Sequence, residues 1–181
     1  MDIETRARNI ALLILDVDGV LTNGQLLFGD QGEAMKLFHV QDGLGITAAQ
    51  RAGLKVAIIT GRESEMVRRR GAELKMTDVY QGAADKVQAY HELMNKYNLT
   101  PDQTAYMGDD LNDLAVMSRA GLACTVANAV PDVKQRAHVI TTREGGHGAV
   151  REVIEFILRS QGKWEQIVVE YLKPVIQEVR Q

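Results

Sequence analysis

Cysteine is nearly absent from this chain, which has one cysteine in 181 residues. A single thiol cannot form a disulfide framework, and it cannot build a metal site from several cysteines. Cys124 lies in the apolar run of residues 122–126, so we expect it to be buried as a small structural side chain.

Long hydrophobic runs and an excess of positive charge are also missing. The apolar run of residues 10–15 stops at Asp16, so it fits neither a membrane span nor a signal peptide. The formal net charge is −3, and the densest basic cluster is only residues 68–70. We therefore expect a cytoplasmic protein that binds neither membranes nor nucleic acid.

Proline is scarce, and no low-complexity tract or linker divides the chain. A chain of this length with an average globular composition suits one domain, so residues 1–181 are predicted to form a single domain. The tail of residues 162–181 changes character and carries an apolar stripe that suits a partner surface, with a helix interruption expected at Pro174. The stripe consists of Trp164, Ile167, Val168, Tyr171, Leu172, Val175 and Val179.

Short apolar runs alternate with helix-like segments along most of the chain. This alternation predicts an α/β fold with a Rossmann-like, doubly wound parallel sheet. A β-hairpin flap is predicted over about residues 24–38, because residues 25–28 and 34–38 flank a turn. The expected strands are residues 11–15, 55–59, 104–107, 122–126 and 138–141, and the expected helices are residues 44–52, 65–74, 85–97, 111–120 and 148–160.

Two carboxylates, Asp16 and Asp18, directly follow the first expected strand, at the edge where open α/β sheets bind ligands. Phosphoryl transfer needs a nucleophile, a cation ligand and an acid, and aspartates can supply all three. An ordinary acidic turn or a generic cation-binding loop would show the same Asp-x-Asp-Gly string, so these residues alone leave the choice open.

The ends of later strands supply complementary groups. Thr60 offers a hydroxyl to a phosphate oxygen, and Gly61 lets backbone N–H groups approach the anion. Lys86 supplies positive charge, and the segment 108–113 carries Asp109, Asp110 and Asp113, which suit a hard, oxygen-seeking cation. Each residue alone could be an ordinary surface group, but the ordered set indicates a phosphatase.

These four ordered motifs resemble those of the haloacid dehalogenase superfamily. A closer resemblance, from about Leu12 to Glu152, is to the family of 3-deoxy-D-manno-octulosonate 8-phosphate phosphatases. It rests on the hairpin and on the segments 16–22, 39–43, 60–62, 80–82 and 145–152.

This resemblance implies magnesium-dependent hydrolysis of that sugar-acid phosphate, through an aspartyl-phosphate intermediate, in lipopolysaccharide precursor biosynthesis. Asp16 would attack phosphorus, while Asp18 would protonate the leaving oxygen and then activate water. Mg²⁺ would bind a carboxylate oxygen of Asp16, the backbone carbonyl of Asp18 and a carboxylate oxygen of Asp109. Asp113 is expected to support these ligands without binding the ion, and Asp110 remains unassigned.

The same resemblance implies which residues surround the substrate. Arg62 lies inside a strong local motif, whereas Arg70 is a weaker assignment. The full set of expected substrate-binding residues is Asp18, His39, Val40, Gln41, Asp42, Gly43, Arg62, Arg70 and Lys86.

Superfamily members usually carry a cap domain over the site, but this sequence has room for none between its motifs. The resembling family is a homotetramer with its hairpins packed together, so we expect neighbouring subunits to complete an open site. The run Gly145-Gly146-His147-Gly148 would lead into a C-terminal portion that approaches an adjacent subunit's site. A flexible entry to a helix explains these glycines equally well.

Three alternatives remain open at this stage. A phosphatase of a nine-carbon sialic-acid-type 9-phosphate would share the chemistry. A non-catalytic oligomerisation module is disfavoured by the intact Asp16, Asp18, Lys86 and Asp109. A receiver-type signalling domain would share the sheet but not the Asp-x-Asp pair with its distant aspartate cluster.

Overall fold

A six-stranded sheet with the strand order β5-β4-β1-β6-β7-β8 forms the middle layer of the computed structural model, which describes residues 2–173. All neighbouring strands in it run parallel, which confirms the doubly wound α/β arrangement. The strands are β1 (Leu12–Leu15), β4 (Lys55–Ile59), β5 (Val79–Tyr80), β6 (Thr104–Gly108), β7 (Leu122–Thr125) and β8 (Val139–Ile140).

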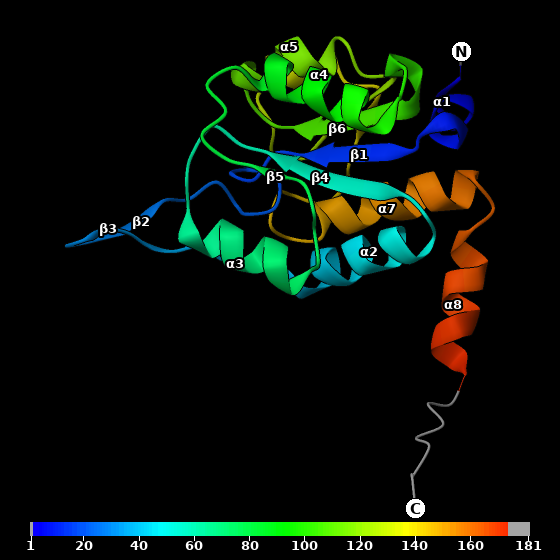
Figure 1. The fold of residues 1–181 in the computed structure, drawn as a ribbon, viewed down its shortest axis with the longest axis horizontal. Coiled ribbons are helices and arrows are strands. Elements are labelled where there is room, and N and C mark those ends of the chain that lie inside the picture. The colour runs from blue at the N-terminus through cyan, green and yellow to red at the C-terminus, as the bar shows by residue number, and fades with distance from the viewer. Residues whose placement is uncertain (1, 174–181) are drawn as a thin grey trace, which may run out of the picture.

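Helices cover both faces of the sheet (Figure 1). α4 (Lys86–Tyr97) and α5 (Leu114–Met117) lie on one face, and α2 (Val40–Arg51), α3 (Glu65–Glu73) and α7 (Ala149–Ser160) lie on the other. The remaining helical segments are α1 (Ile3–Asn9), α6 (Pro131–Lys134), α8 (Trp164–Leu172) and the 3₁₀ turns η1 (Pro101–Gln103) and η2 (Leu111–Asp113). Among the described residues, no helix is both long and apolar enough to cross a membrane.

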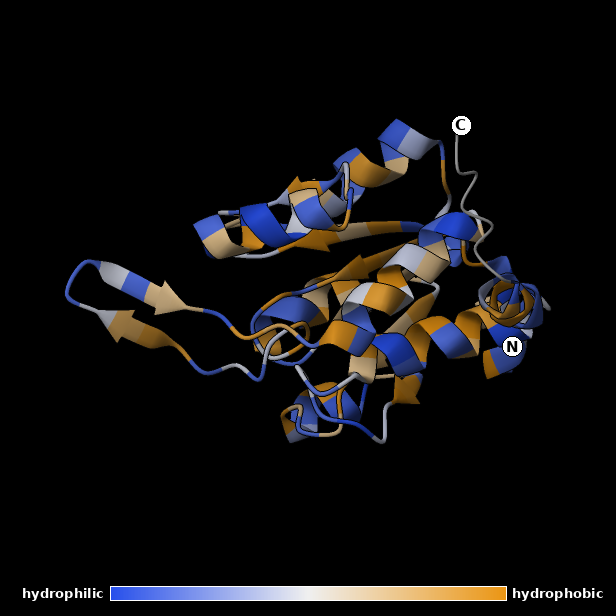
Figure 2. Cartoon of the chain, turned by 90° about the horizontal axis from the view of Figure 1, so that it is seen from below, coloured by the Kyte–Doolittle hydropathy of each residue, from blue (hydrophilic) through white to orange (hydrophobic). Residues whose placement is uncertain are grey.

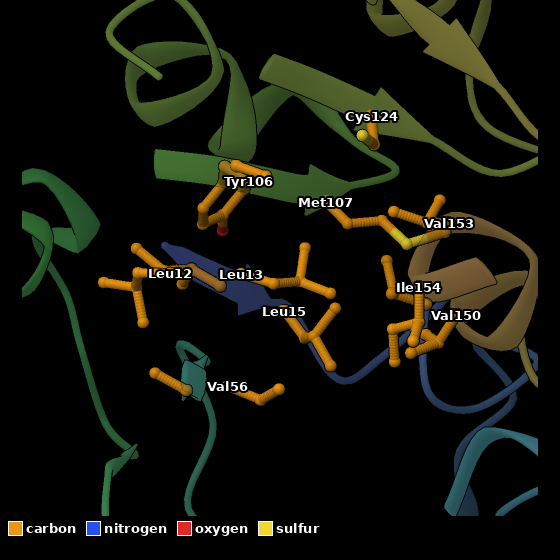
Figure 3. Packing of buried hydrophobic residues seen from close by; sticks show 14 of the residues in the cluster. Leu12, Leu13, Leu15, Val56, Tyr106, Met107, Cys124, Val150, Val153 and Ile154 are labelled. Carbon is orange, nitrogen blue, oxygen red and sulfur yellow. The ribbon is translucent and has the colours of Figure 1, made fainter. Parts of the chain in front are cut away.

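The hydrophobic core explains why strand β1 takes the central position. All four of its residues are fully buried, as expected for a strand covered on both faces. Figure 3 shows Leu15 of β1 and Met107 of β6 facing Val150 and Ile154 of α7, and all four side chains are inaccessible to solvent. This packing fixes the carboxyl end of β1, where the catalytic candidates begin.

The β-hairpin stands away from the sheet (Figure 2). It consists of β2 (Leu27–Gly29) and β3 (Gly32–Met35), which pair antiparallel with a register irregularity between Leu27 and Phe28. The observed strands are shorter than the predicted segments, but the flap is present, and the described chain contains no cap domain. The fold prediction is therefore confirmed.

Two expected helices differ from the observed ones. The expected helix at residues 111–120 is divided into η2 and α5, because Asp110 and Asp113 form a capping box that tightens the first turn. Helix α2 begins at Val40 rather than at residue 44, so the segment 39–43 forms its N-cap and first turn.

The predicted tail stripe is only partly described. Trp164 and Ile167 of α8 are buried, whereas Tyr171 and Leu172 are exposed. Pro174, Val175 and Val179 lie outside the described residues.

Candidate active site

The carboxyl ends of β1, β4 and β6 border a cavity of about 250 Å³, which we call the active-site cavity. Its lining combines acidic, basic and hydroxyl side chains from three of the predicted motifs, together with Lys86 from the first turn of α4. The lining residues are Asp16, Asp18, Gly24, Thr60, Gly61, Arg62, Lys86, Asp109, Asp110 and Asn112. The structure therefore brings together all the residues predicted for catalysis and for metal binding.

Lys86 ties two of these carboxylates together. Its Nζ lies 3.0 Å from Asp16 Oδ2 and 2.7 Å from Asp113 Oδ1, and all three side chains are almost fully buried. Asp85 caps α4 by accepting hydrogen bonds from the backbone N–H groups of Val87 and Gln88, which fixes the helix start beside the cavity. An ammonium group at this point can orient both the nucleophile and a bound phosphate.

Asp113 has its carboxylate oxygens engaged by donors. Oδ1 accepts from the Tyr106 hydroxyl at 2.6 Å as well as from Lys86, and Oδ2 accepts from the backbone N–H of Asp109 at 2.9 Å and of Asp110 at 3.3 Å. These contacts suit a residue that holds the loop and Lys86 in place, as predicted, better than a residue that binds a cation directly.

The cavity raises the pKa of two of its carboxyl groups. Burial and then the Asp113 charge raise the pKa of Asp16 to about 6, and burial followed by the charges of Asp113 and Asp16 raises the pKa of Asp109 to about 7. Burial lowers the pKa of Lys86, but the carboxylates of Asp16 and Asp113 outweigh it and hold the pKa above its ordinary value. The cavity thus holds crowded negative charge that a cation would relieve.

The donor set fits a divalent cation that prefers oxygen ligands. Asp16 Oδ1 is buried and has no hydrogen-bond partner among the described residues. One carboxylate oxygen each from Asp16, Asp109 and Asp113 lies within 4.8 Å of the others. The Asp109 carboxylate also packs against Gly19, where a Cβ atom would come within 2.0 Å of Oδ2, so glycine is required at this point of the loop. Hard cations such as Mg²⁺ prefer such oxygens.

Asp18 lies on the flap side of the cavity between two positively charged side chains. Lys36, just after β3, forms an ion pair with Asp18 Oδ1, and Arg62 Nε lies 3.7 Å from Asp18 Oδ2. Sequence reasoning missed Lys36. A weak signal was available, because strand alternation places Lys36 on the opposite face from the exposed Met35 and Leu37.

Four of the predicted substrate-binding residues border a different, smaller cavity. His39, Asp42, Gly43 and Arg70 line it together with apolar side chains from several elements, among them Ile46 of α2 and Val67 of α3, and its volume of about 10 Å³ leaves room for about one water molecule. Arg70 pairs with Glu73 at 2.8 Å. Within one chain, these four residues do not line the active-site cavity.

The other two predicted substrate residues lie at the start of α2. Val40 is 79% exposed, and Gln41 Oε1 accepts a hydrogen bond from Arg143 Nη1 at 2.6 Å. The structure places neither in the lining of the active-site cavity. Their role toward the substrate stays a prediction.

The glycine run before α7 packs directly on the loop that follows β1. The backbone N–H of Gly146 donates to the carbonyl of Val20 at 3.0 Å, and a Cβ atom on Gly145 would lie 1.7 Å from the carbonyl oxygen of Gly19. Glycine is therefore required at Gly145 for close approach, which a merely flexible helix entry would not need.

Comparison with known proteins shows which family this chain resembles. Residues 71–154 match the model of the haloacid dehalogenase-like hydrolase family. The chain is 48% identical over 164 residues to 3-deoxy-D-manno-octulosonate 8-phosphate phosphatase KdsC of Yersinia pestis, covering 91% of this chain and 88% of that protein.

Two solved structures that resemble this chain are also named octulosonate 8-phosphate phosphatases, and both contain metal ions. The phosphatase from Moraxella catarrhalis, in complex with magnesium, phosphate and a KDO molecule, is 41% identical, with a TM-score of 0.90 and coverage of 93% of this chain and 97% of that one. The cobalt-bound phosphatase from Haemophilus influenzae is also 41% identical, with a TM-score of 0.89 and coverage of 93% and 99%.

The fold, the four motifs and the acidic cavity define a phosphatase of the haloacid dehalogenase type. Within that class, the chain belongs to the family of 3-deoxy-D-manno-octulosonate 8-phosphate phosphatases, since the Yersinia relative is nearly half identical along almost its whole length.

Proposed function

We propose that this chain hydrolyses 3-deoxy-D-manno-octulosonate 8-phosphate to the free sugar acid and phosphate, in the supply of lipopolysaccharide precursors. The observation that carries the proposal is the buried Asp16–Lys86 pair beside Asp18, Thr60 and Asp109 in one cavity. The relatives' names and the complex of the Moraxella enzyme support the choice of substrate.

In this mechanism Asp16 is the nucleophile. A carboxylate oxygen of Asp16 forms a bond to phosphorus while the bond from phosphorus to the sugar oxygen breaks, and Asp18 gives its proton to that departing oxygen. Asp18 then accepts a proton from water, whose oxygen attacks phosphorus and releases phosphate from Asp16. Lys86 and the Thr60 hydroxyl hold the phosphoryl oxygens during both steps.

Magnesium is the cofactor in this proposal. Asp16, the backbone carbonyl of Asp18 and Asp109 would hold it, with Asp113 fixing the loop behind them. When bound, the ion neutralises the charge of the phosphoryl oxygens and of the crowded carboxylates. Asp110 lines the cavity and caps η2, and this proposal gives it no role as a metal ligand.

The proposed assembly is a homotetramer acting in the cytoplasm, with each chain forming one phosphatase domain. The support is the apolar surface of the hairpin and the absence of a cap domain from the described chain. In such an assembly Arg70 and the first turn of α2 could reach the substrate of a neighbouring subunit.

The direct test is a hydrolysis panel with and without Mg²⁺. The panel contains the eight-carbon sugar-acid 8-phosphate, a sialic-acid 9-phosphate, glucose 6-phosphate and p-nitrophenyl phosphate. We expect the highest kcat/KM for the eight-carbon substrate and no turnover in excess chelator. Preference for the nine-carbon substrate would contradict the proposed specificity.

A further inference from the structure

Lys36 is buried in a segment where nothing else is. Within residues 24–37, all of which the structure describes, it is the one buried residue, and its side chain is 1% exposed. Lysine is rarely buried without charged partners. The apolar side chains of this hairpin, in contrast, face outward, and Phe28 is 65% exposed. The hairpin thus buries its charged lysine and exposes its apolar side chains, which is the reverse of the usual pattern. This indicates that the flap directs Lys36 toward specific partners.

The partners of Lys36 are two carboxylates on different elements. Its ammonium group pairs with Asp18 Oδ1, and it lies 2.9 Å from Glu33 Oε1. The other Glu33 oxygen, Oε2, accepts a hydrogen bond from the Ser64 hydroxyl at the start of α3. The base of the flap is thus tied both to the catalytic loop and to the helix that follows β4.

The two oxygens of Asp18 have different surroundings. Oδ1 is held by Lys36, which solvent does not reach, whereas Oδ2 faces Arg62 at 3.7 Å, and the Arg62 side chain is 45% exposed. An exposed arginine at that distance moves away at little cost, while a buried pair holds its geometry. Oδ2 is therefore the oxygen that a substrate can approach.

We propose that Lys36 is a positioning residue that holds Asp18 Oδ1, so that Oδ2 carries the proton to the leaving oxygen and takes the proton back from water. The inference rests on the proposed phosphatase function and adds a residue from the flap to it. Lys36 itself forms no bond to phosphorus and transfers no proton. Its contribution is the orientation of a carboxyl group that must meet the leaving oxygen within hydrogen-bond reach.

Substrates with different leaving groups distinguish a positioning role of Lys36 toward Asp18 from a general structural role. A sugar alkoxide needs a proton to leave, whereas p-nitrophenolate leaves without one, and kcat/KM covers the steps up to the release of the leaving group. We expect Lys36→Met to lower kcat/KM for the sugar-acid phosphate and for glucose 6-phosphate by roughly 10- to 100-fold, the effect of misplacing a catalytic group by about 1 Å. The loss should lie in kcat, and kcat/KM for p-nitrophenyl phosphate should stay near the wild-type value.

Several variants control the comparison. Lys36→Arg keeps the charge and should recover most of the lost activity, and Lys55→Met makes the same change at an exposed lysine at the start of β4 and should have no effect. If Lys36→Met does not fold, Lys36→Gln decides in the same way, with a smaller selective loss expected. An equal loss for alkyl and aryl substrates, or no loss for either, would overturn the inference.

The activity of the wild-type enzyme on different phosphates separates an error about Lys36 from an error about the proposed function. A wild-type enzyme that turns over glucose 6-phosphate but not the sugar-acid phosphate would disprove the proposed substrate while still reporting on Lys36. A wild-type enzyme inactive on every phosphate would disprove the function, and the role of Lys36 with it.

Discussion

Asp16 is the residue on which the proposed chemistry depends most. Asp16→Asn should eliminate turnover, because an amide cannot form the acyl phosphate, while the side chain keeps nearly the same size. Burial raises the pKa of Asp16 to about 6, so at neutral pH the neutral amide also removes an unfavourable buried charge. We therefore expect a melting temperature equal to or above that of the metal-free wild type. Turnover close to wild type would refute the mechanism.

Arg62 offers a test of substrate selection at the same scale. Its guanidinium group suits a carboxylate or nearby hydroxyls of the substrate, because the phosphate has Thr60 and Lys86 beside it. Arg62→Ala should lower kcat/KM for the sugar-acid phosphate by roughly 10- to 150-fold, the cost of about 1.5–3 kcal/mol for a hydrogen bond to a charged group. Glucose 6-phosphate, which lacks a carboxylate, should lose much less. An equal loss for both substrates would place Arg62 in the phosphate site, and the loss for glucose 6-phosphate also separates Arg62 from Lys36.

The loop before α7 allows a prediction at the scale of elements. A methyl group at Gly145 would come within 1.7 Å of the Gly19 carbonyl oxygen, so Gly145→Ala must push the loop after β1 away from its position. We expect a loss of about 1–3 kcal/mol in the free energy of unfolding, measured in urea, and a parallel loss of kcat. Gly29→Ala is the control, because its new methyl group would meet only Ala34 at 3.4 Å. Unchanged stability of the Gly145 variant would contradict this packing.

How far the sequence predicts these elements depends on whether the signal is local. Strand β1 was predictable, because a continuous apolar run that ends in carboxylates is itself the signal of a buried parallel strand. The division of residues 111–117 into η2 and α5 was missed, because it depends on the cap between Asp110 and Asp113 rather than on periodicity. Helix α1 was missed as well, since its described residues bury only Ala7 and give little apolar pattern.

The candidate site shows the same limit. Asp16, Asp18, Thr60, Lys86 and Asp109 stand at strand or helix ends, where parallel-strand topology brings them together, so their ordered positions indicated a shared site, and the family resemblance supplied their individual roles. Lys36 escaped notice because a lysine on a hairpin is ordinarily solvated, and its burial follows from how the flap folds back on the catalytic loop.

At the scale of the whole molecule, pH and metal should act on stability together. The folded-state pKa values of Asp16, about 6, and Asp109, about 7, lie above the ordinary value of 3.8. Between roughly pH 4 and pH 7 the folded chain therefore holds more protons than the unfolded chain, and the contribution of these groups to stability falls as pH rises.

Magnesium should offset that loss. At a free concentration of 100 times its Kd it should add about 2.7 kcal/mol to the free energy of unfolding. Thermal melts in chelator and in Mg²⁺ at pH 5 and pH 8 should show a larger Mg²⁺ effect at pH 8, because protons compete for the ligands at pH 5. Asp109→Asn should abolish most of the response. An equal Mg²⁺ effect at both pH values would contradict binding at these carboxylates.

The hairpin is the feature from which we expect the chain to form an oligomer. Its exposed apolar side chains form a surface, which we call the flap surface, that is unusual for an isolated chain. The flap surface consists of Leu26, Leu27, Phe28, Met35 and Leu37, each at least 40% exposed. A closed, symmetric assembly that packs hairpin against hairpin would bury this surface and narrow the entrance to a site without a cap.

Light scattering should therefore give a mass larger than a dimer, about four times the 20.0 kDa of one chain for the proposed tetramer. Phe28→Ser and Leu37→Ser should shift the protein to smaller species, because each removes apolar area from the flap surface. Ile3→Ser, at a residue that is 43% exposed on α1, makes a comparable change away from the hairpin and should leave the mass unchanged. If neighbouring subunits complete the site, kcat/KM for the sugar-acid phosphate falls with dissociation. A monomer with full activity at the assay concentration would contradict this role for the flap.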